Sequence, residues 1–198
     1  MEYLHNLWTS FQGRGVIPEY RKYMTMHIND VLIHNPDYTL VDCGCGTGLI
    51  YEHLPYEDYR SRYTGFDFTQ DAVDYCLEKY PEGTFYRGDL LDPESFKRGD
   101  LMVTQNVIQH ILLWQEAIRN IYSKKPEVIL MCERTQTQPT EIAGYDPAVR
   151  WRFNIDDYRK VLEFYGGDDY TPVEILVHPR TTKNELDMLT IYRTRRRI

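Results

Sequence analysis

Short apolar runs alternate with stretches of helical periodicity along most of this chain. Residues that favour β-strands gather at 40–41, 62–68, 84–90, 100–105 and 127–132. Between these runs, apolar residues recur every three or four positions, which predicts helices at 49–54, 69–80, 92–97 and 111–121. Strands that alternate with helices indicate a doubly wound parallel sheet with helices on both faces.

The C-terminal third follows a different pattern. The fifth strand is expected to end before Glu133 and Arg134, and the segment 143–152 is irregular, aromatic and basic, so we expect a loop that shapes a substrate pocket. A helix at 156–165 precedes two strand candidates, 173–178 and 186–193. Only a turn-rich link separates these two strands, so we expect them to pair antiparallel.

Length and charge narrow the class of protein. At 198 residues, the chain is long enough for one well-packed domain and short for two. No apolar run approaches the ~18 residues that cross a bilayer, and the N-terminus does not resemble a secretory signal, so we expect a cytoplasmic protein with no membrane partner. The net charge of -7 argues against a protein whose main task is to hold a nucleic-acid backbone. The arginines at 193 and 195–197 are the local exception, and a solvated tail is the favoured interpretation.

The cysteines do not form a metal-binding set. Cys43 and Cys45 lie in a glycine-rich turn, Cys76 in a helical pattern and Cys132 at the end of a strand. No second Cys or His pair with metal-ligand spacing accompanies the first two. We therefore expect reduced thiols and no metal.

The most informative stretch is the turn that follows the first strand. An apolar strand runs into Asp42 and then into glycines at every second position, Gly44, Gly46 and Gly48. Glycine allows a sharp bend, a positive φ and a close approach of the backbone to a ligand. The dinucleotide fingerprint G-x-G-x-x-G does not fit, because its third glycine would fall on Leu49 or Tyr51.

This turn is similar to the D-x-G-x-G-x-G motif of the class I S-adenosylmethionine-dependent methyltransferases. The order of strands and helices resembles the fold of that family over residues 38–195, a Rossmann-like, seven-stranded, mostly parallel sheet with an antiparallel last strand. The resemblance implies one domain over residues 1–198, with residues 1–36 forming helices over the ligand site. It also implies S-adenosylmethionine as the cofactor, and a turn (Cys45 included) whose backbone N–H groups face the methionine part while Asp42 braces it or receives the amino group.

Two further acids end the second and third strands. Asp67 lies where an acid accepts hydrogen bonds from both ribose hydroxyls, and Phe68 beside it is placed to lie against adenine or in the core. Asp89 resembles the family position that binds the adenine amino group, with the backbone N–H of Leu90 as a neighbouring donor. The alternatives are acids that start or cap helices, and Asp92 competes with Asp89 for that role.

The loop after the fourth strand carries the candidate catalytic residue. Residues 105–111 resemble the histidine-bearing loop of many small-molecule methyltransferases, which implies that Asn106 and Val107 line the cofactor and that His110 points near the methyl group. A neutral imidazole with a pKa near ~6.5 can accept a proton from a hydroxyl nucleophile. The alternative is a histidine that packs at the start of the next helix or touches the cofactor.

Arginines near the expected site are candidates for anion binding. Arg134, Arg150 or Arg152 is placed to hold an anionic group of the acceptor. In the N-terminal segment, aromatic and basic residues are placed to form a lid, with an arginine reaching the cofactor carboxylate; they are Trp8, Phe11, Arg14, Tyr20 and Arg21. Each of these arginines has the alternative of an ordinary surface ion pair.

The sequence therefore predicts methyl transfer from S-adenosylmethionine, with a small molecule favoured as acceptor and nucleic acid or protein left open. An NAD(P)-dependent reductase or epimerase is the first alternative; it needs the missing third glycine and usually a Tyr-x-x-x-Lys pair. A non-catalytic protein that keeps the S-adenosylmethionine pocket is the second. The acceptor, the methylated atom and the oligomeric state stay open.

Overall fold

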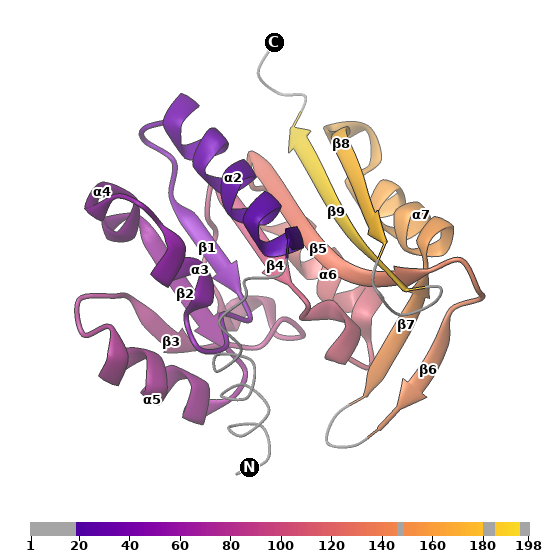
Figure 1. Cartoon of the computed structure of the whole chain (residues 1–198), viewed down its shortest axis with the longest axis horizontal. Helices are drawn as coiled ribbons and strands as arrows, with labels where there is room; N and C mark the ends of the chain where they lie inside the picture. The colour runs from indigo at the N-terminus through magenta and orange to yellow at the C-terminus, as the bar shows by residue number, and fades with distance from the viewer. Residues whose placement is uncertain (1–18, 146–148, 180–184, 195–198) are drawn as a thin grey trace.

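Five parallel strands form the centre of the computed structural model, which describes residues 19–145, 149–179 and 185–194. Their order across the sheet is β3 (Phe85–Arg87), β2 (Tyr63–Asp67), β1 (Leu40–Cys43), β4 (Leu101–Gln105) and β5 (Val128–Gln136). β9 (Glu185–Thr194) pairs antiparallel with the whole of β5, and β8 (Tyr170–Pro179) pairs antiparallel with β9. This confirms the expected mostly parallel sheet with an antiparallel last strand (Figure 1).

Helices cover both faces of this sheet, as the alternating pattern predicts. α2 (Glu19–His34), α3 (Leu49–His53), α4 (Glu57–Ser61) and α5 (Gln70–Lys79) contribute to one buried cluster, which includes Leu40, Val103 and Leu130. α6 (Trp114–Ser123) and α7 (Ile155–Gly166) contribute to a second cluster on the opposite face, with Val41 and Met102. Neighbouring strand residues thus enter opposite clusters, which explains why the central strands are apolar at nearly every position. Figure 1 shows α2 in front of the sheet and α6 behind it.

Three short 3-10 helices complete the described elements: η1 (Pro93–Ser95), η2 (Ile108–His110) and η3 (Gly167–Asp169). Asp92 caps η1 by accepting a hydrogen bond from the backbone N–H of Glu94 at 3.1 Å. Of the expected N-terminal helical region, the structure describes α2, which packs Met24, Ile28 and Leu32 into the core. Trp8, Phe11 and Arg14 lie outside the described residues. None of the described helices has the length and hydropathy needed to cross a bilayer.

The expected loop at 143–152 is wrong in part, because the chain forms a hairpin there. β6 (Glu141–Gly144) pairs antiparallel with β7 (Arg150–Asn154), which adds two strands to the seven expected, and β7 pairs with the end of β5. β5 is also longer than expected, so Glu133 and Arg134 lie within it. The charged residues of β7 make its alternation of exposed and buried positions hard to recognise in the sequence. Phe153 is fully buried, and its ring centroid lies 5.0 Å from that of Tyr158 and 4.7 Å from that of Trp114.

Phe153→Ala tests whether this stacking holds the hairpin to the body of the protein. We expect the free energy of unfolding to fall by ~3–5 kcal/mol, because a large buried ring leaves a cavity between Trp114 and Tyr158. Phe164→Ala is the matched control, since Phe164 is 77% exposed and its loss should change stability by less than ~0.5 kcal/mol. Urea denaturation measures both; equal effects would show that the hairpin is not anchored through Phe153.

Candidate active site

The glycine turn has the backbone conformation that its sequence predicts. Gly44, Gly46 and Gly48 have φ values of 82°, 53° and 74°, in the left-handed region that other residues rarely adopt. The turn is also tightly packed: a Cβ on Gly44 would lie 2.6 Å from Val107 Cγ2, and one on Gly48 would lie 2.7 Å from Tyr80 Cε2. All three glycines therefore satisfy a conformational requirement, and Gly44 and Gly48 satisfy a steric one as well.

Hydrogen bonds close this turn onto the end of β2. The backbone N–H groups of Gly44 and Cys45 donate to the carbonyl oxygen of Phe66 at 2.8 and 2.9 Å, and that of Gly46 donates to Asp67 Oδ2 at 2.9 Å. The N–H of Gly48 donates to the Cys45 carbonyl at 3.0 Å. A cofactor could use these N–H groups only by sharing or displacing the hydrogen bonds that they already make. The main contribution of the glycines is therefore that they let the backbone approach a ligand closely.

Asp67 stands beside the turn, at the carboxyl end of β2. Its Oδ1 accepts hydrogen bonds from the N–H and the hydroxyl of Thr69, at 3.0 and 2.8 Å. Thr69 occupies the N-cap position of α5, but its hydroxyl donates to Asp67 and makes no cap hydrogen bond. A carboxylate has about four acceptor sites, so after three internal bonds Asp67 Oδ2 keeps capacity for one further donor, such as a ribose hydroxyl.

Phe68 is a side chain of the surface and not of the core. It is 61% exposed, which removes the alternative of a core aromatic at this position. The Arg87 guanidinium lies 6.0 Å from its ring, and Arg87 Nε donates to the Phe68 carbonyl at 3.2 Å. An exposed ring held next to Asp67 offers a flat apolar surface to a nucleobase.

Asp89 does not cap η1, because Asp92 does so. Asp89 Oδ1 accepts from the N–H of Leu91 at 2.8 Å, and within the described residues no hydrogen bond reaches Oδ2. Ser95 fixes the backbone by accepting from the Asp89 N–H at 2.7 Å, and Asn120 donates to the Leu90 carbonyl at 2.8 Å. Asp89 thus presents one carboxylate oxygen at the end of β3, as a group that binds an exocyclic amine must.

Asp42 lies deeper than the other acids. It is 2% exposed and accepts a hydrogen bond from the Tyr63 hydroxyl at 2.8 Å. Burial raises the pKa of Asp42 to about 7, the Tyr63 hydrogen bond opposes this shift, and the charge of Asp67 adds to it. Among the two roles expected for Asp42, this placement favours a brace under the turn.

The loop after β4 is held by a buried carboxylate that the sequence did not single out. Glu133 in β5 is fully buried, and its Oε1 accepts from the N–H groups of Val107 and Ile108, both at 3.1 Å. Its other oxygen accepts from the N–H of Gln109 at 3.4 Å. Burial raises the pKa of Glu133 to about 7, and these backbone hydrogen bonds oppose the shift. An acid at the end of an apolar strand was the available signal, but its partners lie more than twenty residues away in sequence.

This anchor fixes the two residues expected to line the cofactor. Asn106 has a φ of 57°, an uncommon value outside glycine, and its N–H donates to the Cys132 carbonyl at 2.8 Å. Val107 packs directly over Gly44. The β4 loop and the glycine turn therefore meet at the carboxyl ends of β1 and β4.

His110 ends η2 and faces the hairpin. Its Nδ1 lies 3.2 Å from the Val149 carbonyl, and its Nε2 lies 3.3 Å from Gln109 Nε2. A carbonyl oxygen only accepts, so we assign the proton to Nδ1, and Nε2 then accepts from the Gln109 amide. Burial lowers the pKa of His110, the Val149 bond opposes this, and the charges of Arg150 and Arg134 lower it further. The ring is therefore neutral near pH 7. Its acceptor nitrogen, Nε2, faces the Gln109 amide, and another hydrogen-bond donor can replace that amide.

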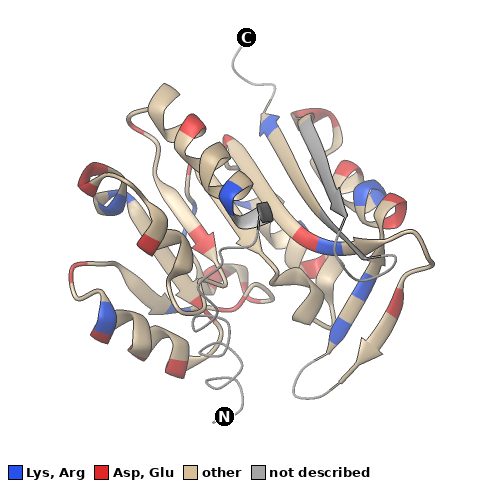
Figure 2. Cartoon of the chain, viewed as in Figure 1, with Lys and Arg blue, Asp and Glu red and all other residues tan. Residues whose placement is uncertain are grey.

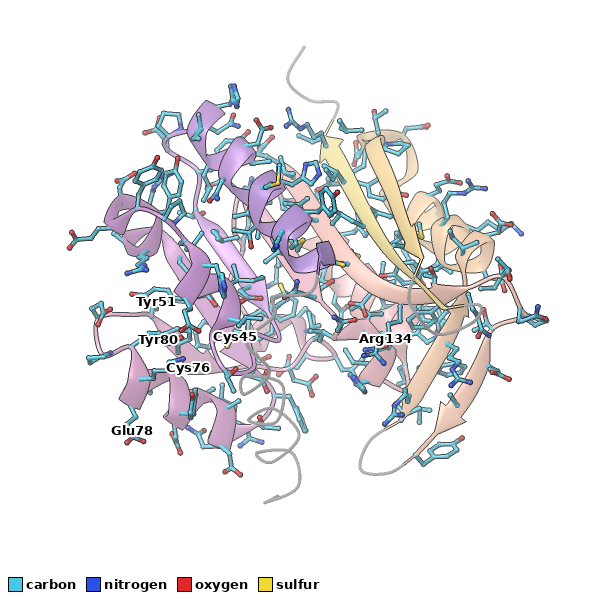
Figure 3. The ribbon with its side chains drawn as sticks, viewed as in Figure 1. Cys45, Tyr51, Cys76, Glu78, Tyr80 and Arg134 are labelled. Atoms are coloured by element: carbon cyan, nitrogen blue, oxygen red, sulfur yellow. The ribbon has the colours of Figure 1, made fainter. Side chains whose placement is uncertain are left out.

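The three candidate arginines differ in their surroundings, and two of them, Arg150 and Arg134, act electrostatically on His110. Arg152 pairs with Glu141 across the hairpin, with Nη1 to Oε1 at 3.5 Å. Arg150 is exposed, and Arg134 is partly buried in β5. Figure 2 shows basic residues along β7 and a basic residue beside an acidic one in β5, and Figure 3 places Arg134 on this side of the molecule, away from Cys45 and Cys76.

The cysteine cluster lies under the turn. Cys45 is 6% exposed and Cys76 is fully buried, and the Cys76 thiol lies 3.2 Å from the Gly46 carbonyl. A hydrogen bond to Cys76 and burial raise the pKa of the Cys45 thiol well above its usual range. Within the described ranges, no group of three or more metal-ligating side chains occurs. Cys45 therefore supports the turn from below with its neutral thiol.

A Tyr-x-x-x-Lys spacing does occur, at Tyr75 and Lys79 on α5, but not at the site. Lys79 Nζ binds Glu52 at 3.3 Å, and Lys79 is the last residue of a helix that starts at the carboxyl edge. At ~1.5 Å per residue, it lies more than ~10 Å from that edge along the helix axis. The pair gives no support to a reductase.

Comparison with known families agrees with this geometry. Residues 41–131 match the family model described as a methyltransferase domain. This range begins in β1, just before the glycine turn, and ends in β5, so it contains Asp67, Asp89 and His110. The comparison with curated protein sequences finds no match.

Solved structures share the fold at low sequence identity. A TehB-like S-adenosylmethionine-dependent methyltransferase from Corynebacterium glutamicum has a TM-score of 0.63 at 19% identity, over 98% of this chain and 97% of its own. Magnesium protoporphyrin IX methyltransferase from Synechocystis PCC 6803, with bound S-adenosylmethionine, has a TM-score of 0.66 at 17% identity, over 96% and 91%. The cyclase SpnF has a TM-score of 0.73 at 12% identity, over 92% and 84%. At these identities, the likeness shows the fold alone.

Glu133→Gln isolates the effect of the buried carboxylate on stability. Burial raises the pKa of Glu133 to about 7, so the stability it contributes is present below its unfolded pKa and is lost as the pH rises through about 7. Glutamine does not titrate. The free energy of unfolding of the wild type, relative to the variant, should therefore fall by ~1–3 kcal/mol between about pH 5 and about pH 8. Urea denaturation at both values measures it, and a constant difference would show that the backbone N–H groups keep the carboxylate charged throughout.

Proposed function

Because the chain belongs to the class I S-adenosylmethionine-dependent methyltransferases, we propose that it transfers a methyl group to a small molecule at the carboxyl edge of β1 to β5. The family model supports the reaction class that the sequence predicted. The observation that carries the proposal is the convergence of four chain segments at one edge: the glycine turn, Asp67, Asp89 and the β4 loop. Ligands of open parallel sheets bind beyond this edge.

The residues at the edge fit S-adenosylmethionine in the order in which the strands lie. Asp67 Oδ2 has capacity for a ribose hydroxyl, the exposed Phe68 ring offers a face to adenine, and Asp89 Oδ2 can accept from the adenine amine. The glycine turn, with Asp42 beneath it and Cys45 within it, approaches the methionine part, and Leu90, Asn106 and Val107 complete the lining. When bound, S-adenosylmethionine supplies an electrophilic methyl carbon on a sulfonium.

The protein contributes position and one proton acceptor. The residues at the edge would hold the acceptor's lone pair in line with the methyl carbon and with the sulfur that leaves as the new bond forms, and this alignment would supply much of the rate enhancement. Where the nucleophile carries a proton, His110 Nε2 takes it, because the ring is neutral and its Nδ1–H is held by Val149. The Gln109 amide must give up Nε2 for this step.

The net charge of the chain and the substrate named for one structurally similar enzyme both favour a small-molecule acceptor. The net charge of -7 disfavours a nucleic-acid backbone, and one structurally similar enzyme is named for magnesium protoporphyrin IX, a small molecule. Nucleic acid and protein acceptors are the outcomes that would overturn this part. The single-domain organisation, the lid formed by residues 1–36 and the cytoplasmic location stay predictions from the sequence.

Thermal unfolding tests the choice of cofactor. S-adenosylmethionine and S-adenosylhomocysteine should raise Tm, because a ligand that binds only the native state stabilises it by mass action. NAD and NADP should leave Tm unchanged, since the glycine spacing does not match their fingerprint. An equal shift with NAD would contradict the proposal.

Asp67→Asn tests the ribose contact. The substitution keeps an oxygen for Thr69 but replaces Oδ2, which accepts from the Gly46 N–H and would accept from the ribose hydroxyl, by an NH2 donor, so S-adenosylhomocysteine should bind about 10 to 100-fold more weakly. Asp71→Asn, on the exposed first turn of α5, is the matched control and should bind as the wild type does. Calorimetry measures both; unchanged affinity in Asp67→Asn would place the ribose elsewhere.

His110→Ala tests the mechanism once an acceptor is known. We expect a loss of ~10²–10⁴ in turnover with little change in cofactor affinity, because the variant lacks the proton acceptor. The wild-type rate should rise with pH through the lowered pKa of His110, since only the neutral ring accepts a proton. His34→Ala, at an exposed position of α2, serves as control. Joint loss of affinity and turnover would make His110 a wall of the site, and no change in either would leave it a packing residue.

A further inference from the structure

Arg134 and Arg150 project from the same face of the β5–β7 pair. β5 and β7 are parallel, with Thr135 opposite Phe153 and Gln136 opposite Asn154. Side chains alternate along a strand, so Arg134 projects from the same face as Gln136, and Arg150 from the same face as Asn154. Both guanidinium groups act on the imidazole of His110 electrostatically. The face opposite to that of Trp151 and Phe153 is therefore basic, and the charges of Arg134 and Arg150 on it reach the imidazole of His110.

Arg150 differs from the next arginine on its strand. Arg152 forms an ion pair with Glu141, with 3.5 Å between Nη1 and Oε1. Arg150 is exposed, and within the described residues no carboxylate lies in ion-pair distance of it. Arg150 is the first residue of β7, directly after the hairpin loop, and the carbonyl of the residue before it, Val149, lies 3.2 Å from His110 Nδ1.

Open space lies next to Arg150 on the neighbouring strand. Its partner in the β6–β7 register is Gly144, and the register shifts between Ile142 and Gly144. A Cβ placed on Gly144 would meet nothing within 4 Å. Among the described residues, Arg150 is therefore a cation without an ion-pair partner, beside a glycine at which a side chain would have room.

We propose that the acceptor carries an anionic group, a carboxylate or a phosphate, which binds Arg150 in the space beside Gly144 while its nucleophile is directed to His110. This inference rests on the proposed function, since it names the class of acceptor for that site. A guanidinium binds either anion through two parallel hydrogen bonds. Burial is the main cause of the lowered pKa of His110 and the charge of Arg150 adds to it, so one residue would serve both anion binding and proton acceptance.

The anion has a second effect on the histidine. An anion at Arg150 offsets the positive charge that acts on the imidazole, so the pKa of His110 should rise when the site is filled. The ring resonances of His110, assigned by comparison with His110→Gln, therefore report binding without any need for turnover. The charged groups that act on this ring are Arg150 and Arg134.

Three probe molecules that share a phenyl ring but differ in charge test the proposal. Each is titrated into the full chain in the presence of S-adenosylhomocysteine and followed by NMR. Benzoate and phenyl phosphate carry the two anions, and benzamide is the neutral match of benzoate. We expect at least one anion to shift the His110 resonances and raise its pKa, with binding about tenfold or more tighter than that of benzamide. The tighter of the two anions identifies the group.

Paired variants locate the contact. Arg150→Gln should weaken the anion about tenfold and leave benzamide unchanged, whereas Arg152→Gln, on the same face of the same strand, should have no effect. Gly144→Val should also weaken the anion, because its side chain fills the open space without meeting other atoms. Equal binding of benzoate, phenyl phosphate and benzamide, or equal anion affinity in the two arginine variants, would overturn the inference.

Calorimetry on the same samples separates this inference from the proposed function. A wild type that binds S-adenosylhomocysteine but does not distinguish the probes overturns the anionic acceptor only. A wild type that does not bind S-adenosylhomocysteine overturns the proposed function itself.

Discussion

The hydrogen bonds that close the glycine turn onto the end of β2 fix the position of Asp67 beside the turn at the carboxyl edge. Two of them reach the Phe66 carbonyl and a third reaches the carboxylate of Asp67. They form only because three residues of the turn adopt positive φ, which glycine does without a steric cost. The same bonds orient Asp67, so the turn and the expected ribose contact are one structural unit.

A second unit joins the other half of the edge. The carboxylate of Glu133 is buried in β5 and gathers the backbone N–H groups that begin η2, where His110 lies. Val107, within this loop, packs against Gly44, so the two units touch. A buried acid costs free energy unless it is hydrogen-bonded. The hydrogen bonds that satisfy Glu133 also hold the candidate catalytic loop in place.

The parts of the site that the sequence predicted are those decided by local rules. Alternate glycines after a strand, acids at strand ends and helical periodicity depend on neighbouring residues, and they located Gly44 to Gly48, Asp67 and Asp89. The parts that it missed depend on distant partners. Glu133 acts on a loop of another strand, Tyr63 binds Asp42 from the adjacent strand, and Phe153 shows its buried face only against Trp114 and Tyr158.

The fold does not by itself determine the chemistry, since a cyclase and methyltransferases share it with this chain. The central claim is therefore that the four segments at the carboxyl edge bind one S-adenosylmethionine molecule. A crystal structure of the complex with S-adenosylhomocysteine tests it most directly. The account predicts that the ribose contacts Asp67 and that the adenine lies between Phe68 and Asp89. It predicts that the sulfur lies beside the β4 loop, near His110. A ligand bound away from Asp67, or an edge left empty at saturating ligand, would contradict it.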